Sequence, residues 1–199
     1  MLNIPLNRTY TLAPILVSVL LLAIFLLPEA LLLQLTYERP NIQAGQWWRL
    51  LTGQFVHLSW GHLAINIAGI WVMYLLYAEH AAGWRYIAVV GLLALASNLG
   101  MYWFAENITY YVGFSGVLYG LFAWGALLDV HQRIKLGWLL LVGIVLKVTW
   151  EYCYGPVSVG PATADDLAVA AHFYGAVGGL LVAGLTIFLA RLRSLKPQE

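Results

Sequence analysis

Six apolar stretches alternate with polar connections along the chain, and we interpret each as a membrane-spanning helix. We place these spans at about 11–27, 61–78, 84–104, 115–129, 136–154 and 166–190. The connection 28–60 is longer and partly apolar, so we expect it to lie at the membrane interface, anchored by Trp47, Trp48 and Trp60. The pattern predicts an all-α polytopic membrane protein with a single domain over residues 1–199.

The first apolar stretch also has features of a signal peptide, because Arg8 precedes the run from Leu12 to Leu27. A signal peptide ends in a small-x-small cleavage site, whereas Pro28-Glu29-Ala30 follows here. We therefore interpret this stretch as a retained first span.

Composition supports a membrane protein. Of the 199 residues, 62% are hydrophobic and 10% are charged, more apolar surface than a soluble domain of this size could bury. The net charge of +1 and the lack of basic clusters give no indication of nucleic-acid binding. The single cysteine, Cys153, excludes an intramolecular disulfide and a cysteine-based metal site, and we expect it to be a small buried residue.

Lysine and arginine gather on one side of the predicted topology. They fall at the two termini and in the connections after spans two and four: Arg8, Arg85, Arg133, Lys135, Arg191, Arg193 and Lys196. The opposite side keeps only Arg39 and Arg49. The positive-inside rule then places both termini in the cytoplasm, so that spans two, four and six begin on the outer side.

A serine flanked by glycines opens the fourth span, at Gly113-Phe114-Ser115-Gly116. The glycines allow close approach of another backbone, and a helix that starts at the serine directs free N–H groups at whatever lies there. Ser115 is therefore a candidate nucleophile with part of an oxyanion hole. The alternative is packing alone, because Gly116-xxx-Gly120 is also a common contact pattern between membrane helices.

The fourth span is short for a membrane. Residues 113–128 give about 24 Å of helix, whereas the hydrocarbon core is about 30 Å thick. With Asp129 and Arg133 at the inner surface, Ser115 must lie below the outer one, and 106–114 must enter the membrane as irregular backbone. Such backbone needs surrounding protein or a water-filled cavity, so we expect a wet pocket with Ser115 at its floor.

His172, in the sixth span, is the candidate base. It precedes Arg191 by about as many residues as Ser115 precedes Arg133, so two parallel spans bring the two groups to one level. Tyr119 lies one turn after Ser115, where it can stack on the imidazole and fix its rotamer.

Small residues favour close packing of these two spans. Gly175 and Gly179 follow His172 on its own face, and Gly116 and Gly120 form a similar strip on the fourth span. We expect the two backbones to lie in contact along these glycines.

His62 and Asn66 lie four residues apart on one face of the second span, at the same end. Both can donate hydrogen bonds toward the pocket, as an oxyanion-binding pair would. Alternatively, they only tie the spans together.

Two further features stand apart from this cluster. Lys147 and Glu151 are four residues apart in the fifth span, and we expect an internal ion pair, with a role in a proton path as the alternative. The Gly- and Pro-rich connection 155–163 is either a mobile cap or an ordinary connector.

The combination of these motifs, in this order, resembles the rhomboid family of intramembrane serine proteases. The resemblance runs from about residue 48 to 185 and consists of Trp48-Arg49, His57, His62-x-x-x-Asn66, Gly113-x-Ser115-Gly116 with Tyr119, and Ala171-His172-x-x-Gly175-x-x-x-Gly179. It implies a six-helix rhomboid-like bundle and a dyad of Ser115 as nucleophile and His172 as general base and acid. It also implies an oxyanion hole of His62, Asn66 and the Ser115 backbone N–H, and a structural role for Trp48 and Arg49 in the first outer loop.

The compact six-span form is most similar to the rhombosortase branch of that family. This branch implies a bacterial inner-membrane protein whose active site opens to the periplasm. Its substrates would be exported proteins anchored by a single span or a C-terminal segment, with Gly-Gly-type tails that the enzyme removes. We expect no cofactor or metal, because the sequence has no His-Glu-x-x-His motif.

Alternatives to a protease can be distinguished by what each would require of the sequence or of the purified protein. A catalytically inactive rhomboid-like protein that binds membrane clients would be expected to lack the serine or the histidine, and a channel would string polar groups through the whole membrane. Haem or metal binding through His57, His62 and His172 would show in absorbance and metal content. The Gly-x-Ser-x-Gly elbow of soluble hydrolases does not fit, because Val117 replaces its last glycine and no strand is predicted before it.

Overall fold

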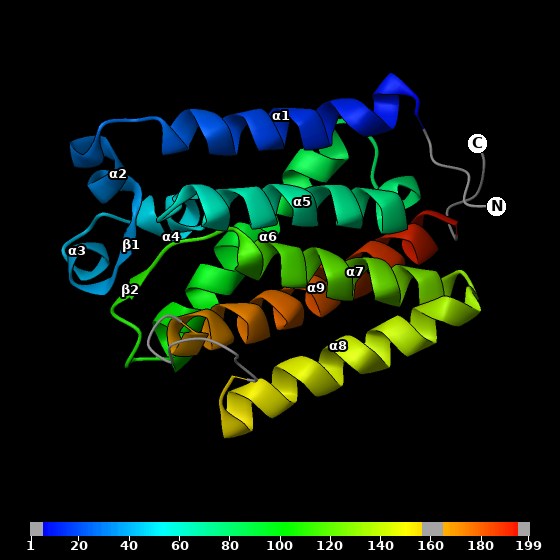
Figure 1. Ribbon diagram of the computed structural model, residues 1–199. Coiled ribbons are helices and arrows are strands. Elements are labelled where there is room, and N and C mark those ends of the chain that lie inside the picture. Colours follow the sequence, from blue (N-terminus) through cyan, green and yellow to red (C-terminus); the bar gives the residue numbers. More distant parts are fainter. Residues whose placement is uncertain (1–5, 157–164, 195–199) are drawn as a thin grey trace.

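Six long helices form a bundle in the computed structural model, which describes residues 6–156 and 165–194 (Figure 1). They are α1 (Arg8–Phe25), α5 (Trp60–Tyr77), α6 (Trp84–Phe104), α7 (Ser115–His131), α8 (Lys135–Tyr154) and α9 (Asp165–Ser194). Each coincides with one of the predicted spans to within a few residues. The largest differences are at α1, which begins at Arg8, and at α9, which continues to Ser194.

Five of these helices are long and apolar enough to cross a membrane. The remaining one, α7, has 17 residues, ten of which are buried. It contacts α5, α6, α8 and α9, whereas outward faces of the surrounding helices carry exposed large apolar side chains such as Ile65, Leu139 and Leu146. This is the burial pattern of a bundle in lipid, with its shortest helix at the centre.

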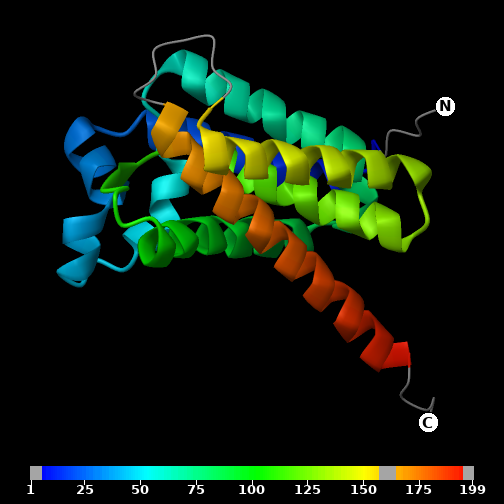
Figure 2. The same ribbon diagram turned by 90° about the horizontal axis from the view of Figure 1, so that it is seen from below.

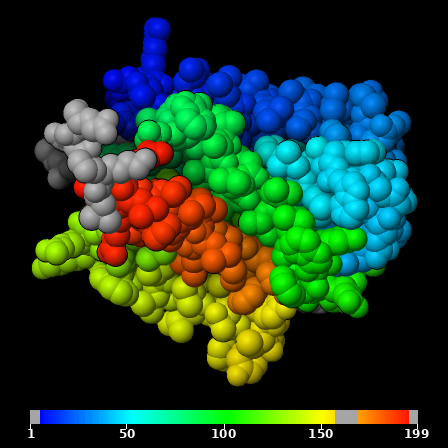
Figure 3. Space-filling view, turned by 180° about the vertical axis from the view of Figure 1, so that it is seen from behind, coloured from blue at the N-terminus to red at the C-terminus, as the bar shows by residue number. Residues whose placement is uncertain are grey.

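Glycines bring α7 and α9 into backbone contact. A Cβ atom at Gly175 would collide with the carbonyl oxygen of Gly116, and one at Gly179 would collide with that of Gly120. The expected contact along these four glycines is therefore present. In Figure 3, α9 lies between α6 and α8, and Figure 2 shows its C-terminal half diverging from the rest of the bundle.

The connection between α1 and α5 folds into short elements at one end of the bundle (Figure 1). They are α2 (Glu29–Leu35), β1 (Tyr37–Glu38), α3 (Arg39–Gln43), α4 (Arg49–Thr52) and the 3₁₀ helix η1 (Gly53–Phe55); another 3₁₀ helix, η2 (Ala78–His80), follows α5. Trp47, Trp48 and Trp60 all have exposed side chains, as interface anchors would.

A short strand pair departs from the all-α prediction. Strand β1 pairs antiparallel with β2 (Tyr110–Tyr111), with Tyr37 opposite Tyr111 and Glu38 opposite Tyr110. The segment before α7, predicted to be irregular throughout, is thus partly fixed by hydrogen bonds to the first connection. Two residues per strand carry no recognisable alternation, so the sequence pattern could not reveal the pairing.

Buried Arg49 and its neighbour Trp48 hold this connection together. Arg49 is 4% exposed, and its Nη1 donates to the carbonyl oxygens of Leu33 and Thr36, both at 2.7 Å. Trp48 Nε1 donates to the carbonyl oxygen of Gln34 at 3.0 Å. These contacts fit the structural role that the resemblance implies for Trp48 and Arg49.

Two other predictions concern α8. Lys147 Nζ lies 2.7 Å from Glu151 Oε2, which confirms the ion pair, although only Glu151 is buried and the Lys147 side chain is about half-exposed. Cys153 is exposed, so the prediction that it is buried is wrong. The buried positions of α8 form a stripe that includes Val148 and Glu151, and a residue two places after Glu151 lies on the opposite side of the helix. Most of the proposed cap, residues 157–163, lies outside the described residues.

Candidate active site

Ser115 is the first residue of α7, and Gly113 creates the turn that precedes it. Gly113 has φ +126°, a conformation that residues with side chains rarely adopt. A Cβ atom at Gly113 would also lie 2.7 Å from two ring atoms of His62. Both the turn and the packing therefore require glycine, and the turn leaves Ser115 half-buried at the start of the helix.

His172 on α9 reaches Ser115 from the neighbouring helix. Its Nε2 lies 2.9 Å from Ser115 Oγ, which is hydrogen-bonding distance. The imidazole stacks on the ring of Tyr119, with centroids 3.9 Å apart and an angle of 7° between the planes. The structure thus brings Ser115, Tyr119 and His172 together. The stacking fixes the orientation of the imidazole ring.

His62 and Asn66 lie on α5, next to the turn that leads into α7. Ser59 caps this helix by accepting a hydrogen bond from the His62 backbone N–H at 3.2 Å. The His62 ring packs against Gly113, two residues before Ser115. Asn66 is buried, and its Nδ2 donates to the carbonyl oxygen of His62 at 2.9 Å. Asn66 is therefore placed beside the site with its amide engaged within its own helix.

Tyr111, on β2, is a site residue that the sequence analysis missed. Its hydroxyl lies 3.1 Å from Ser115 Oγ, and its side chain is buried. A tyrosine four residues before the serine would have been a sequence signal only if the chain between them were helical. Here the intervening chain turns at Gly113, and the strand pair determines where Tyr111 points.

A buried polar network beneath the site was also missed. Gln54 Nε2 donates to Ser97 Oγ at 3.1 Å and to Asn98 Oδ1 at 2.7 Å. Ser97 Oγ in turn donates to the carbonyl oxygen of Ala171 at 3.0 Å, directly before His172. The network links η1, α6 and α9, so it positions the backbone that carries the imidazole.

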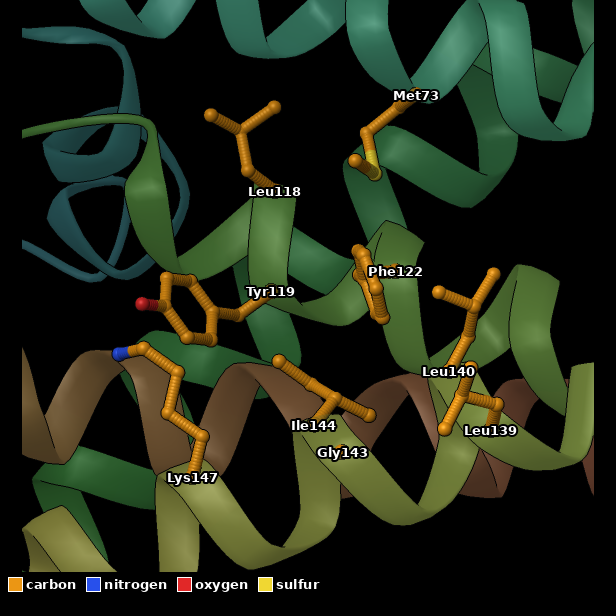
Figure 4. Close-up of a pocket in the computed structure, with 9 residues that line it drawn as sticks. All are labelled: Met73, Leu118, Tyr119, Phe122, Leu139, Leu140, Gly143, Ile144 and Lys147. Atoms are coloured by element: carbon orange, nitrogen blue, oxygen red, sulfur yellow. The ribbon is translucent and has the colours of Figure 1, made fainter.

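An apolar groove of about 350 Å³ adjoins the site between α5, α7 and α8 (Figure 4). Met73, Leu118, Phe122 and Ile144 are among its lining residues. Tyr119 forms one wall and also stacks on His172, so the groove and the Ser115–His172 contact share a side chain. Lys147 lies at the same end, with Nζ 4.8 Å from the centre of the Tyr119 ring.

The histidines near the site form no metal-binding set within the described part of the chain. No three side chains of His, Cys, Asp or Glu gather there in a way that could hold a metal ion. The His57 and His62 rings make an edge-on contact with centroids 5.0 Å apart. Burial lowers the pKa of His57 to about 4, with a smaller contribution from His62, so His57 is neutral at physiological pH.

These features define a class of protein: a polytopic membrane protein with a serine–histidine contact at one end of its bundle. Residues 44–188 match the rhomboid domain family, and because this match covers most of the chain, the protein belongs to the rhomboid family. This family suggests intramembrane serine protease activity.

Two proteins of Bacillus subtilis (strain 168) show the same relationship. The chain is 24% identical to the rhomboid-type protein YdcA over 148 residues. This aligned stretch covers 74% of this chain and 71% of YdcA. The chain is also 24% identical over 148 residues to the rhomboid protease GluP, covering 73% of this chain and 27% of GluP.

Proposed function

We propose that this protein is an intramembrane serine endopeptidase in which Ser115 is the nucleophile and His172 is the general base and acid. The observation that carries the proposal is the 2.9 Å distance between Ser115 Oγ and His172 Nε2. Membership of the rhomboid family supports it independently. The stacking of Tyr119 on His172 supplies the fixed orientation that a base needs.

The reaction would proceed through an acyl-enzyme. Ser115 Oγ attacks the scissile carbonyl carbon while its proton passes to His172 Nε2. His172 then protonates the leaving amine, which departs with the C-terminal product. A water molecule next gives a proton to His172 and attacks the ester, and the proton returns to Ser115 as the second product leaves.

The oxyanion would be stabilised by the start of α7 and by α5. The Ser115 backbone N–H lies in the first turn, where helix N–H groups have no partner within the helix. His62 packs on Gly113 beside it. Asn66 would join them only after its amide turns away from the His62 carbonyl oxygen. We therefore assign the primary role to His62 and the backbone, and a supporting role to Asn66.

The substrate would be a single-span or C-terminally anchored membrane protein. Its apolar side chains match the lining of the groove between α5, α7 and α8, which leads to Tyr119. A peptide bond within a helix is shielded by its own hydrogen bonds, so the segment must unwind before Ser115 can attack it. Glycines near the cut lower this cost, and for this reason we propose Gly-Gly-type tails of exported proteins, as in the rhombosortase branch.

We also propose a topology of six spans with both termini in the cytoplasm. Central α7, although short, would be the fourth of the six spans, since protein surrounds it on several sides. The site would then open to the periplasmic side of a bacterial inner membrane. Fusions of a reporter that is active only outside the cytoplasm test this: after residue 132 they should be inactive, and after residue 107 they should be active.

The central experiment compares cleavage of a single-span test substrate by wild type, Ser115→Ala and His172→Ala. We expect each substitution to lower the rate by at least about 10³-fold, because the base and nucleophile act as one unit. Thr186→Ala and His131→Ala are matched controls, since both side chains are exposed and remote from the site. Cleavage by Ser115→Ala at the wild-type rate would refute the proposal.

The substrate class needs its own experiment. Co-expression with exported proteins that end in a Gly-Gly-type tail should produce a shortened C-terminus with wild type and not with Ser115→Ala. Stable association with a client without a new C-terminus would instead indicate the inactive, client-binding alternative. If spans that lack glycine are cleaved as fast as spans that contain it, the assignment to the rhombosortase branch is wrong. The proposed protease function would not be affected by that result.

A further inference from the structure

The hydroxyl of Tyr111 touches the reacting atom of the proposed protease. It lies 3.1 Å from Ser115 Oγ, which also lies 2.9 Å from His172 Nε2. A serine hydroxyl has one proton and two lone pairs. If Ser115 donates its proton to His172, Tyr111 can donate its own proton to a lone pair of the same oxygen. The two contacts are thus compatible, and together they select one rotamer of Ser115.

Tyr111 is held in this position by the first connection, a segment far from α7 and α9 in the sequence. Strand β2 pairs with β1, which places Tyr37 opposite Tyr111. The Arg39 backbone N–H donates to the Thr109 carbonyl oxygen at 2.9 Å, and its guanidinium donates to carbonyl oxygens at the end of α6. The Tyr111 side chain is only 3% exposed. Its hydroxyl therefore points at Ser115 from a fixed frame, as preorganised catalysis requires.

The phenol keeps its proton throughout the physiological range. Burial raises the pKa of Tyr111 to about 12, although hydrogen bonds with Ser115 and with the backbone of Gly116 act in the opposite direction. A phenol that stays protonated is a hydrogen-bond donor and not a competing base. Hydrogen bonds to a charged oxygen are roughly twice as strong as those to a neutral one, so the contact strengthens as Ser115 loses its proton.

We infer that Tyr111 is a further catalytic residue, which orients Ser115 toward His172 and stabilises the negative charge that develops on Ser115 Oγ during attack. This inference rests on the proposed protease function. In the step concerned, the Ser115 proton moves to His172 Nε2 and the Oγ–carbon bond forms. Tyr111 keeps its proton and donates one hydrogen bond throughout, so no further reactant is needed.

Tyr111→Phe tests this inference, because it removes only the hydroxyl. The bond concerned is to a developing charge, so we expect kcat to fall by about 10- to 100-fold with little change in KM. The rate of labelling by a fluorophosphonate, which reacts with the serine without a peptide substrate, should fall by a similar factor. Tyr110→Phe is the matched control, since it removes the neighbouring hydroxyl on the exposed side of β2.

The two levels of the proposal can be separated. If Ser115→Ala still cleaves, the protease function fails, whatever Tyr111→Phe does. If cleavage requires Ser115 but Tyr111→Phe reacts at the rate of wild type, or faster, only the role of Tyr111 is refuted. Should Tyr111→Phe not fold, a fluorinated tyrosine at position 111 is the second variant. Its phenol is more acidic but still protonated near neutral pH, so it donates a stronger hydrogen bond to Ser115 Oγ and should raise kcat at pH 7. An unchanged or lower kcat would overturn the inference.

Discussion

The contact between α7 and α9 gives a quantitative test of how the site is positioned. Gly179→Ala adds one methyl group that would collide with the Gly120 carbonyl oxygen. Carbon and oxygen atoms approach to about 3.3 Å in ordinary weak contacts. Relieving the collision therefore requires the helices to part by roughly 1 Å, unless the backbone deforms locally. The same movement would stretch the 2.9 Å contact between Ser115 and His172 beyond hydrogen-bonding range.

Activity should respond more strongly than stability. A misplacement of about 1 Å costs up to about 10²-fold in rate. Overpacking of this kind costs about 1–3 kcal/mol of stability, which for a chain of this size lowers the melting temperature by roughly 2–4 °C for each kcal/mol. The assay is cleavage of a single-span substrate in detergent or vesicles, with thermal unfolding measured on the same preparation.

The control is Gly184→Ala on the same helix, where a Cβ atom meets nothing within 4 Å. Replacing a helical glycine by alanine is favourable by up to about 1 kcal/mol when space is available, so this variant should be as stable as wild type or more so. Equal activity and equal melting temperatures for Gly179→Ala and Gly184→Ala would show that the helices tolerate the methyl group. The glycine contact would then not set the distance between Ser115 and His172.

Two further predictions concern stability. Arg39→Gln should lower the free energy of unfolding by roughly 3 kcal/mol, because it leaves buried carbonyl oxygens at the end of α6 without their donor; the exposed Arg85→Gln should not, and equal chemical unfolding midpoints would contradict this. His57 has a folded-state pKa near 4, below its ordinary value of 6.5. Keeping His57 neutral therefore contributes fully to the free energy of unfolding above pH 6.5, and this contribution is lost as the pH falls toward 4. The slope should reach about 1.4 kcal/mol per pH unit in that window, and His57→Gln should remove it from unfolding curves recorded between pH 4 and 7.

The contact between Ser115 and His172 could be predicted because it depends on distance along helices. Ser115 and His172 each lie a similar number of residues before a basic group, and a helix rises by a constant amount per residue. Parallel spans of the same orientation therefore had to bring the two side chains to one depth. The stacking of Tyr119 follows from the same geometry, since it lies one turn from Ser115.

The residues that could not be predicted depend on contacts between distant segments. Tyr111 reaches Ser115 because β1 and β2, more than 70 residues apart, form a two-residue pair. The network of Gln54, Ser97 and the Ala171 carbonyl joins three separate elements. Neither arrangement has a periodicity, so hydrophobic patterning gives no signal for it. The wrong prediction for Cys153 has a related cause, because composition does not tell which face of a lipid-exposed helix turns inward.

The sequence by itself determined the helices, their approximate ends and the serine and histidine that the proposed chemistry uses. These follow from apolar length, helical rise and residue type, which are properties of local chain. Only the tertiary structure decided that Tyr111 lies against Ser115, that Asn66 bonds within α5, and that an apolar groove ends at Tyr119. Those are outcomes of packing between elements far apart in the chain. There the contact of whole surfaces determines where each side chain lies, and no single residue does.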